Sequence, residues 1–278
     1  MNKTIGIAGL GLIGGSMARA IKANTESVVL GLDIRESVQK SAVRQNAIDG
    51  ILMESDLNKC DMVIIALYPH DTIAFVKKNM ENFKKGAVII DCAGVKTSIC
   101  KNLSQLAAKN SLYFIGGHPM TGIEKSGFKN SFAHMFDGAT MILCKDEFTN
   151  IIALRAAEML FTSIGFFNVT ITTAEEHDKI IAFTSQLAHV VAGAYIRSET
   201  AKMQAGFSAG SYRDLTRVAW LNEHMWTELF LENRDYLVKE IDNLIVRLTE
   251  YSKTLKDGNE KKLTGLLLKG KMAKQENG

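Results

Sequence analysis

Hydrophobic and polar positions follow two different patterns along the chain. In about the first 170 residues, short apolar runs alternate with stretches of helical periodicity, which is typical of a parallel sheet covered by helices on both faces. The runs at 62–67 and 87–90 are apolar without alternation, as in strands that are buried on both sides. The expected strands span 4–8, 28–33, 62–67, 87–91, 113–115, 140–143 and 168–172, and the clearest helices span 72–83, 96–109 and 150–164.

The pattern changes near residue 173. From 174 to 255 there is little strand signal and much helical spacing, interrupted by small residues at 206–211. The sequence therefore predicts an α/β protein with a doubly wound N-terminal domain, 1–172, and an all-helical domain, 173–278. Apolar residues at helical spacing between 236 and 248 indicate a core or a subunit interface, and the lysine-rich tail from 253 indicates a solvated helix.

Composition limits the partners and the compartment. The 278 residues are 46% apolar and 23% charged, and the net charge of +3 is too small to favour nucleic acid or an anionic membrane as a partner. The four cysteines form no Cys-x-x-Cys pair and lie in apolar segments, which favours reduced thiols. The apolar stretch 5–18 holds too many glycines for a signal peptide, and no other run approaches the ~20 residues of a membrane span. We expect a cytoplasmic protein.

A glycine pattern follows the first expected strand. Gly9, Gly11 and Gly14 form Gly-x-Gly-x-x-Gly, with Leu12 and Ile13 at the start of the following helix. The first glycine allows a tight turn, the second lets the backbone approach a pyrophosphate, and the third permits close packing of helix on strand. The helix N-terminus then offers free N–H groups to phosphates. This arrangement predicts a Rossmann-type dinucleotide site, and a purely structural glycine turn is the alternative.

An acidic residue supports the dinucleotide interpretation and bears on the choice of cofactor. Asp33 lies 19 residues after Gly14, at the end of the second expected strand, where its carboxylate can accept hydrogen bonds from the adenosine ribose. A carboxylate there would repel a 2′-phosphate, so NAD is favoured over NADP. Arg35 weakens this preference, because a nearby arginine can bind a phosphate.

One histidine lies at the end of an expected strand. The apolar run at 113–115 leads into Gly116, Gly117, His118 and Pro119, so we place this histidine where a strand gives way to a loop. Ligands bind at strand ends in open α/β sheets, and histidine titrates near neutral pH. His118 is therefore a candidate general base, with an ordinary strand-end turn as the alternative.

Three further segments carry polar residues in apolar surroundings. Residues 91–96 follow a buried strand and belong to the same sheet edge as the candidate base. His177 and His189 are 12 residues apart, or about 120° on one helix, so they would not both face one ligand. Arg213 and Arg217 lie four apart near an expected helix start. Arginines suit bidentate carboxylate binding, although such pairs are also common as surface ion pairs.

Together these segments resemble the prephenate dehydrogenase family of tyrosine biosynthesis, which includes arogenate and cyclohexadienyl dehydrogenases. The resemblance runs from residue 5 to about 235. It rests on the glycine loop with its acid, the turn at 91–96, GGHPMTGIEKSG at 116–127, EHD at 176–178 with His189, and RDLTRVA at 213–219. It implies NAD-dependent oxidative decarboxylation of prephenate to 4-hydroxyphenylpyruvate by a homodimer whose helical domains intertwine. Arogenate or both substrates remain the alternative, and no metal is implied.

The resemblance also assigns roles to residues. His118 would take the proton of the substrate hydroxyl, Arg217 would hold a substrate carboxylate, and His189 would line the pocket. Glu124 and Asp214 would belong to an ionic network at the entrance of the pocket. Arg213 is a weaker candidate, either for this network or for holding a substrate carboxylate.

Two positions depart from the family pattern. The family often has a serine that contacts the substrate hydroxyl in the turn after the fourth strand, where this chain has Gly94. The frequent Leu-Pro-His is here Leu187-Ala188-His189.

Two other functions are weaker alternatives. A 3-hydroxyacid dehydrogenase would place a catalytic lysine on a helix of the second domain, and the only candidate is Lys179 at a helix start. A non-catalytic redox sensor that binds NAD(H) would not need His118 and would carry a DNA-binding module, for which the sequence gives no sign.

Overall fold

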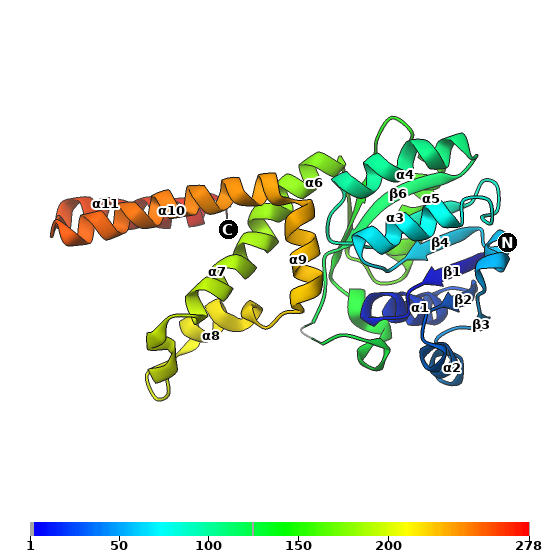
Figure 1. Ribbon diagram of the computed structural model, residues 1–278, viewed down its shortest axis with the longest axis horizontal. Coiled ribbons are helices and arrows are strands. Elements are labelled where there is room, and N and C mark those ends of the chain that lie inside the picture. Colours follow the sequence, from blue (N-terminus) through cyan, green and yellow to red (C-terminus); the bar gives the residue numbers. More distant parts are fainter. Residues whose placement is uncertain (1–2, 124, 278) are drawn as a thin grey trace.

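The computed structural model describes residues 3–123 and 125–277. The N-terminal part forms one sheet with helices on both faces, and the C-terminal part is a helical arm that projects from one end of the sheet (Figure 1). The fold class predicted from the hydrophobic pattern is confirmed.

Eight strands make a single mixed sheet in the order β3-β2-β1-β4-β5-β6-β7-β8. Their bounds are β1 Thr4–Ala8, β2 Val28–Leu32, β3 Gly50–Ile51, β4 Met62–Ile65, β5 Val88–Asp91, β6 Tyr113–Pro119, β7 Thr140–Cys144 and β8 Asn168–Thr172. The N-terminal helices are α1 Leu12–Asn24, α2 Glu36–Arg44, α3 Pro69–Lys78, α4 Thr97–Lys109 and α5 Ile151–Ser163, with 3-10 turns η1 Glu54–Lys59, η2 Phe128–Asn130 and η3 Ala133–Phe136.

The direction of the sheet changes at β6. Its first half, residues 113–115, pairs in parallel with β5, whereas 116–119 pair antiparallel with β7, which in turn runs parallel to β8. His118 lies inside β6, opposite Ile142 of β7. The expectation of a strand ending at 115 with the histidine in a loop was therefore wrong, because Gly116 and Gly117 continue the strand on a new partner.

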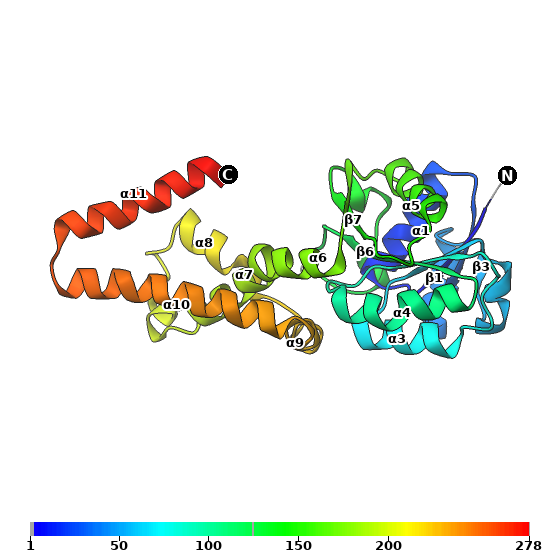
Figure 2. The ribbon, with the colours of Figure 1, turned by 90° about the horizontal axis from the view of Figure 1, so that it is seen from above.

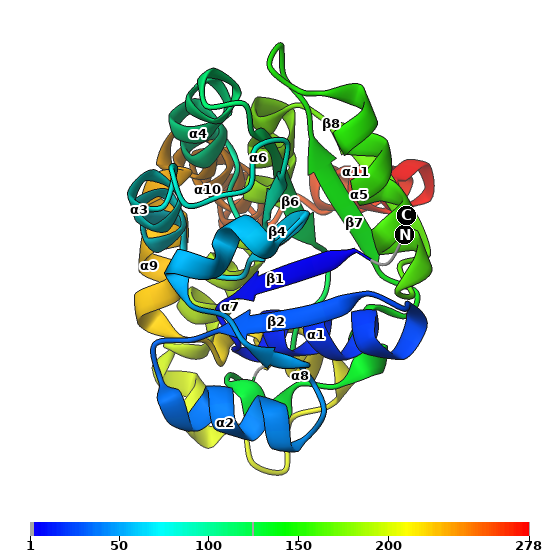
Figure 3. The ribbon, with the colours of Figure 1, turned by 90° about the vertical axis from the view of Figure 1, so that its right-hand side faces the viewer.

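The sheet has a separate apolar core on each face, as its alternating side chains require. On one face, strand residues such as Ile7 and Ile64 pack with Met17 of α1 and Phe161 of α5. On the other face, Ile89 and its neighbours pack against α3 and α4. Figure 2 shows these two helical layers on opposite sides of the strands, and Figure 3 shows the twist of the sheet between them. All four cysteines are buried and free, as predicted.

The helical arm begins directly after the last strand. Thr173 caps α6, its hydroxyl accepting from the N–H of Glu176 at 3.2 Å. The arm consists of α6 Ala174–Ile181, a π-helical turn η4 Ala182–Gln186, α7 Leu187–Ile196, η5 Glu199–Met203, α8 Gly210–Thr216, η6 Arg217–Ala219, α9 Glu223–Glu232, α10 Arg234–Lys256 and α11 Glu260–Asn277. In Figure 2, α10 and α11 run roughly antiparallel and are joined at the end of the arm farthest from the sheet.

Two elements hold the arm against the sheet. α6 contacts α4, and α9 reaches α3 through side chains of Glu228 and Glu232. The expected helix 72–83 begins instead at Pro69, because proline is favoured at the first helical position. It ends at Lys78.

Candidate active site

The glycine loop has the shape that a dinucleotide needs. Gly9 has a φ of +88°, and a Cβ there would lie 2.6 Å from the carbonyl oxygen of Ala66. A Cβ at Gly14 would lie 1.8 Å from the carbonyl oxygen of Gly9, so the helix packs directly on the turn. Gly11 faces open space, and no side chain caps the N-terminus of α1 that follows it. A pyrophosphate can therefore approach Gly11 and accept hydrogen bonds from the first turn, which includes Leu12 and Ile13.

Asp33 follows β2 directly and holds the edge of the loop. Its carboxylate accepts from the N–H of Leu10 at 3.0 Å and from the N–H of Arg35 at 2.9 Å. The guanidinium of Arg35 pairs with the same carboxylate at 3.3 Å and is mostly exposed. The carboxylate retains acceptor capacity for ribose hydroxyls, since each oxygen accepts more than one hydrogen bond.

His118 is joined to a second histidine from the helical arm. The Nδ1 of His118 lies 2.9 Å from the Nε2 of His177, and the Nδ1 of His177 lies 2.7 Å from an oxygen of Asp178. The same carboxylate accepts from the backbone N–H groups of Lys96 and Thr97, both at 2.8 Å. Asp178 thus binds the N-terminus of α4 and the histidine pair at once, and both His177 and Asp178 are almost fully buried.

Burial and hydrogen bonding set the charges of the row formed by His118, His177 and Asp178. Burial lowers the pKa of His118 well below its ordinary value, and the neighbouring His177 and Lys96 lower it further. Burial also lowers the pKa of His177, although the hydrogen bond to Asp178 opposes this. Burial alone would raise the pKa of Asp178, but hydrogen bonds from His177 and Thr97 outweigh it and keep the pKa low. At neutral pH the row is two neutral imidazoles and a carboxylate.

A buried ion pair holds the backbone next to His118. The ammonium of Lys96 contacts the carboxylate of Asp91 and donates to the carbonyl oxygen of Gly117 at 2.6 Å. Asp91 in turn accepts from the N–H of Gly117 at 3.2 Å and of Ala93 at 3.0 Å. Both side chains are completely buried. Burial would lower the pKa of Lys96, but the Asp91 carboxylate raises it above its ordinary value. Burial also raises the pKa of Asp91, and the ammonium of Lys96 opposes this.

A second cluster lies where α7, η6 and α9 meet. The Nδ1 of His189 is 2.8 Å from the carbonyl oxygen of Val218, and its ring lies on Trp226 with 3.7 Å between ring centroids. Burial lowers the pKa of His189, and the nearby charge of Arg217 lowers it further. The structure therefore brings His189 and Arg217 together.

The remaining predicted residues are more scattered. Gly94 follows β5 and faces α9, where a Cβ would lie 3.3 Å from the side chain of Leu229. Arg213 and Asp214 are exposed on α8. Glu124 lies outside the described residues. Lys179, the candidate for a 3-hydroxyacid dehydrogenase, is exposed on α6.

α9 links the helical arm to α3 of the sheet domain. Glu228 accepts from the backbone N–H of His70 at 2.7 Å, and Glu232 contacts the ring of His70 at 2.7 Å. The hydrogen bond that the ring donates to Glu232 raises the pKa of His70. A buried amide pair fixes α9 from the other side: Gln186 donates to the carbonyl oxygen of Leu229, and Asn233 donates to Gln186.

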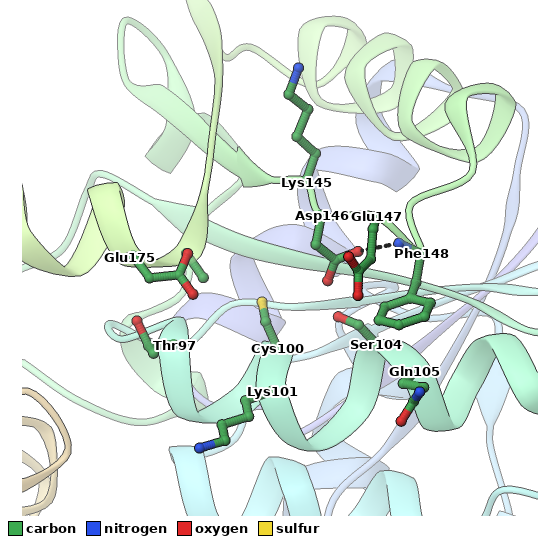
Figure 4. A pocket seen from close by; sticks show the side chains of 11 residues that line it. Thr97, Cys100, Lys101, Ser104, Gln105, Lys145, Asp146, Glu147, Phe148 and Glu175 are labelled. Carbon is green, nitrogen blue, oxygen red and sulfur yellow. Dashed lines mark hydrogen bonds between the residues drawn. The ribbon is translucent and has the colours of Figure 1, made fainter.

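A hollow of about 330 Å³ lies elsewhere, between α4 and the turn after β7. Figure 4 shows that its wall carries charged side chains of both signs, including Lys101, Asp146 and Glu175. None of the predicted site residues lines it, so we do not assign it to the reaction.

Comparison with protein families decides what kind of protein this is. A family model described as the prephenate dehydrogenase nucleotide-binding domain matches residues 17–168, more than half of the chain. The chain belongs to the prephenate dehydrogenase family. A second family model, the prephenate dehydrogenase dimerization domain, matches residues 173–269. The resemblance read from the sequence motifs is confirmed.

Individual relatives agree with this assignment. A prephenate dehydrogenase of Lactococcus lactis is 30% identical over 98% of this chain and 77% of its own. A cyclohexadienyl dehydrogenase of Zymomonas mobilis is 33% identical over 88% of this chain and 86% of its own. The crystal structure of prephenate dehydrogenase from A. aeolicus with hydroxyphenyl propionate and NAD+ is similar at 25% identity and a TM-score of 0.86, over 99% of this chain and 98% of the other.

Sequence reasoning missed two residues of these clusters. His177 was noted in the helical-wheel comparison with His189 and within a family motif but was given no role, and its contact with His118 joins positions 59 residues apart. Trp226 gave no signal, because an aromatic residue on an amphipathic helix usually belongs to a core. Both become visible only when the arm is placed against the sheet.

Proposed function

We propose that this protein oxidises and decarboxylates prephenate to 4-hydroxyphenylpyruvate, with NAD as the hydride acceptor. The observation that carries the proposal is His118, a neutral imidazole near the end of β6, in the same sheet as the strand that leads into the glycine loop, held by a histidine and a carboxylate of the helical arm. We propose a domain boundary between residues 172 and 173. Residues 1–172 bind the dinucleotide, and residues 173–278 complete the substrate site and form the dimer.

The reaction balances without a net proton. The carbon that bears the ring hydroxyl loses a hydride, and the hydroxyl proton passes to His118 as the C–O bond becomes C=O. The bond to the ring carboxylate then breaks, its electrons enter the ring, and carbon dioxide leaves. The ring becomes an aromatic phenolate, and His118 returns the proton to its oxygen.

The other assigned residues would bind and orient the substrate. Arg217 would hold a substrate carboxylate, and its nearness to the His189 ring supports a shared pocket. Because Gly94 has no hydroxyl and faces Leu229, the contact that the family serine makes would be missing here or supplied by the backbone, by water or by a neighbouring residue. Asp214 and Glu124 would belong to an ionic network at the entrance, and Arg213 is a weaker candidate for it.

NAD is the proposed cofactor, and its bound nicotinamide supplies the hydride acceptor. The open space at Gly11 and the uncapped start of α1 fit its pyrophosphate, and the carboxylate of Asp33 fits its ribose. The carboxylate disfavours the 2′-phosphate of NADP. The A. aeolicus structure that resembles this chain holds NAD+, which supports the choice.

Arogenate is the second candidate substrate. It differs from prephenate by an amine in place of a keto oxygen, and the cyclohexadienyl dehydrogenase of Zymomonas mobilis is a relative at 33% identity. An arogenate dehydrogenase of Synechocystis shares the fold, with a TM-score of 0.84 at 23% identity.

We also propose that the arm forms a homodimer in the cytoplasm. Large apolar side chains are exposed along it, and the matched domain of the family is the dimerization domain. By length and composition alone, one helical stretch of the described chain, Ala174–Ile196, could cross a membrane. Its apolar exposed face is what a second subunit would cover; Phe183 is 62% and Ile180 is 50% exposed.

The test is a spectrophotometric assay of NADH or NADPH formation with prephenate and arogenate, each offered with NAD and NADP. We expect the fastest turnover with prephenate and NAD. Faster turnover with arogenate would keep the mechanism and change the substrate. No turnover in any of the four mixtures would refute the proposal.

A further inference from the structure

The side chains of His118, His177 and Asp178 form an unbroken row across the junction of the two domains. The two contacts are 2.9 and 2.7 Å, and they join β6 of the sheet to α6 of the arm. We infer that His177 is a positioning residue that, through Asp178, fixes the tautomer of His118 and leaves its Nε2 as the proton acceptor. The inference rests on the proposed function and gives a role to a residue that the proposal uses only as a contact of His118.

The tautomers follow from the carboxylate end of the row. A carboxylate only accepts hydrogen bonds, and Asp178 is surrounded by three donors: the N–H groups of Lys96 and Thr97, and the ring of His177. The Nδ1 of His177 must therefore carry its proton. A neutral imidazole has one N–H, so the Nε2 of His177 is left as an acceptor.

The same rule then applies to His118. Because the Nε2 of His177 accepts, the Nδ1 of His118 must donate to it across 2.9 Å. The single proton of neutral His118 is thereby placed on Nδ1, and Nε2 keeps its lone pair. The low pKa values of both rings agree with neutral imidazoles, and Lys96 and Asp91 are the other charged groups that act on this row.

The row also changes what happens after proton transfer. When Nε2 of His118 receives the hydroxyl proton, the imidazolium has its Nδ1–H already directed at His177. The positive charge is then stabilised through His177 by the carboxylate of Asp178. No proton has to leave the site, so it remains available for return to the phenolate oxygen.

Two substitutions of His177 separate this role from simple packing. His177→Met fills the buried space but provides no comparable acceptor for His118, whereas the amide oxygen of His177→Gln can accept at the position of Nε2. We expect His177→Met to lower kcat about tenfold or more, with KM for prephenate and for NAD within about threefold of wild type. His177→Gln should recover most of this loss. His134→Met, at an exposed ring that pairs with Asp137, is the matched control and should keep full activity.

Histidine ring 15N spectra of the wild-type protein provide a readout that needs no turnover. The expected result is a neutral His118 with its proton on Nδ1, opposite to the tautomer that free imidazole side chains prefer. A proton on Nε2 would overturn the inference, and so would a His177→Met enzyme with normal kcat.

The two proposals can fail separately. If wild type turns over prephenate but His177→Met is unimpaired, the row has no positioning role and the proposed function stands. If wild type turns over neither prephenate nor arogenate while the spectra give the Nδ1–H tautomer, the proposed function fails and the tautomer assignment stands.

Discussion

Replacing Lys96 with methionine tests how the buried ion pair supports the site. The substitution keeps an unbranched side chain as far as Cε but removes the ammonium that contacts Asp91 and the carbonyl oxygen of Gly117. Asp91 would then be a completely buried carboxylate with only the N–H groups of Ala93 and Gly117 as donors. Removing one partner of a buried pair costs about 3–5 kcal/mol. At roughly 2–4 °C per kcal/mol for a chain of this size, the melting temperature should fall by about 6–20 °C.

The pH dependence of this loss has a definite sign. In Lys96→Met, burial without the ammonium raises the pKa of Asp91 in the folded state above its unfolded value. The folded protein then binds more protons than the unfolded one between these two values, so its stability falls as the pH rises through that range. The difference in melting temperature from wild type should therefore shrink toward acidic pH.

The assay is scanning calorimetry of Lys96→Met, of Asp91→Asn and of the variant that carries both substitutions. Asp91→Asn combined with Lys96→Met removes both charges, and we expect it to regain at least about half of the stability that Lys96→Met loses. The reasoning is refuted if Lys96→Met melts within about 2 °C of wild type, or if the effects of the two single substitutions simply add.

Three further predictions concern other parts of the site. His118→Asn should leave NAD affinity, measured by titration, unchanged and lower kcat roughly 10²–10⁴-fold; near-normal turnover would exclude a general base at this position. Arg217→Ala should raise the KM for prephenate far more than the KM for NAD, and an unchanged KM for prephenate would rule out the carboxylate contact. Because Glu232 raises the pKa of His70, their contact stabilises the folded state at pH values below about 6.5 and loses its effect as the pH rises through the raised value. His70→Phe should therefore lower the melting temperature at pH 6 and not at pH 9, whereas equal differences at both pH values would contradict this.

The sheet and the cofactor loop were predictable because local signals agree with the fold there. The buried strands at 62–65 and 88–91 are continuous apolar runs, and the geometry of the loop requires glycine at Gly9 and Gly14 whatever lies elsewhere. The same local logic failed at β6. Nothing near Gly116 indicates that the strand continues, because its new partner β7 lies more than twenty residues further along the chain.

The parts of the site that were missed depend on contacts between the two domains. His177 is one of five consecutive polar residues, 175–179, at the start of an amphipathic helix, and its role exists only because α6 packs on α4 and points the ring at His118. The helical-wheel argument for His177 and His189 also assumed one regular helix. The π-helical turn at 182–186 interrupts that helix between them, and such turns have no sequence signature of their own.

The position of His118 inside β6 has a consequence for motion. Its neighbours Gly117 and Pro119 both pair with β7, so the candidate base is carried by the sheet and not by a loop. Amide hydrogens in such a strand should exchange only through opening of the sheet, whereas a loop would exchange readily. Because the glycine loop follows β1 of the same sheet, the base and the cofactor loop keep a fixed distance from each other, whereas any movement of the helical arm would change the contact between His118 and His177.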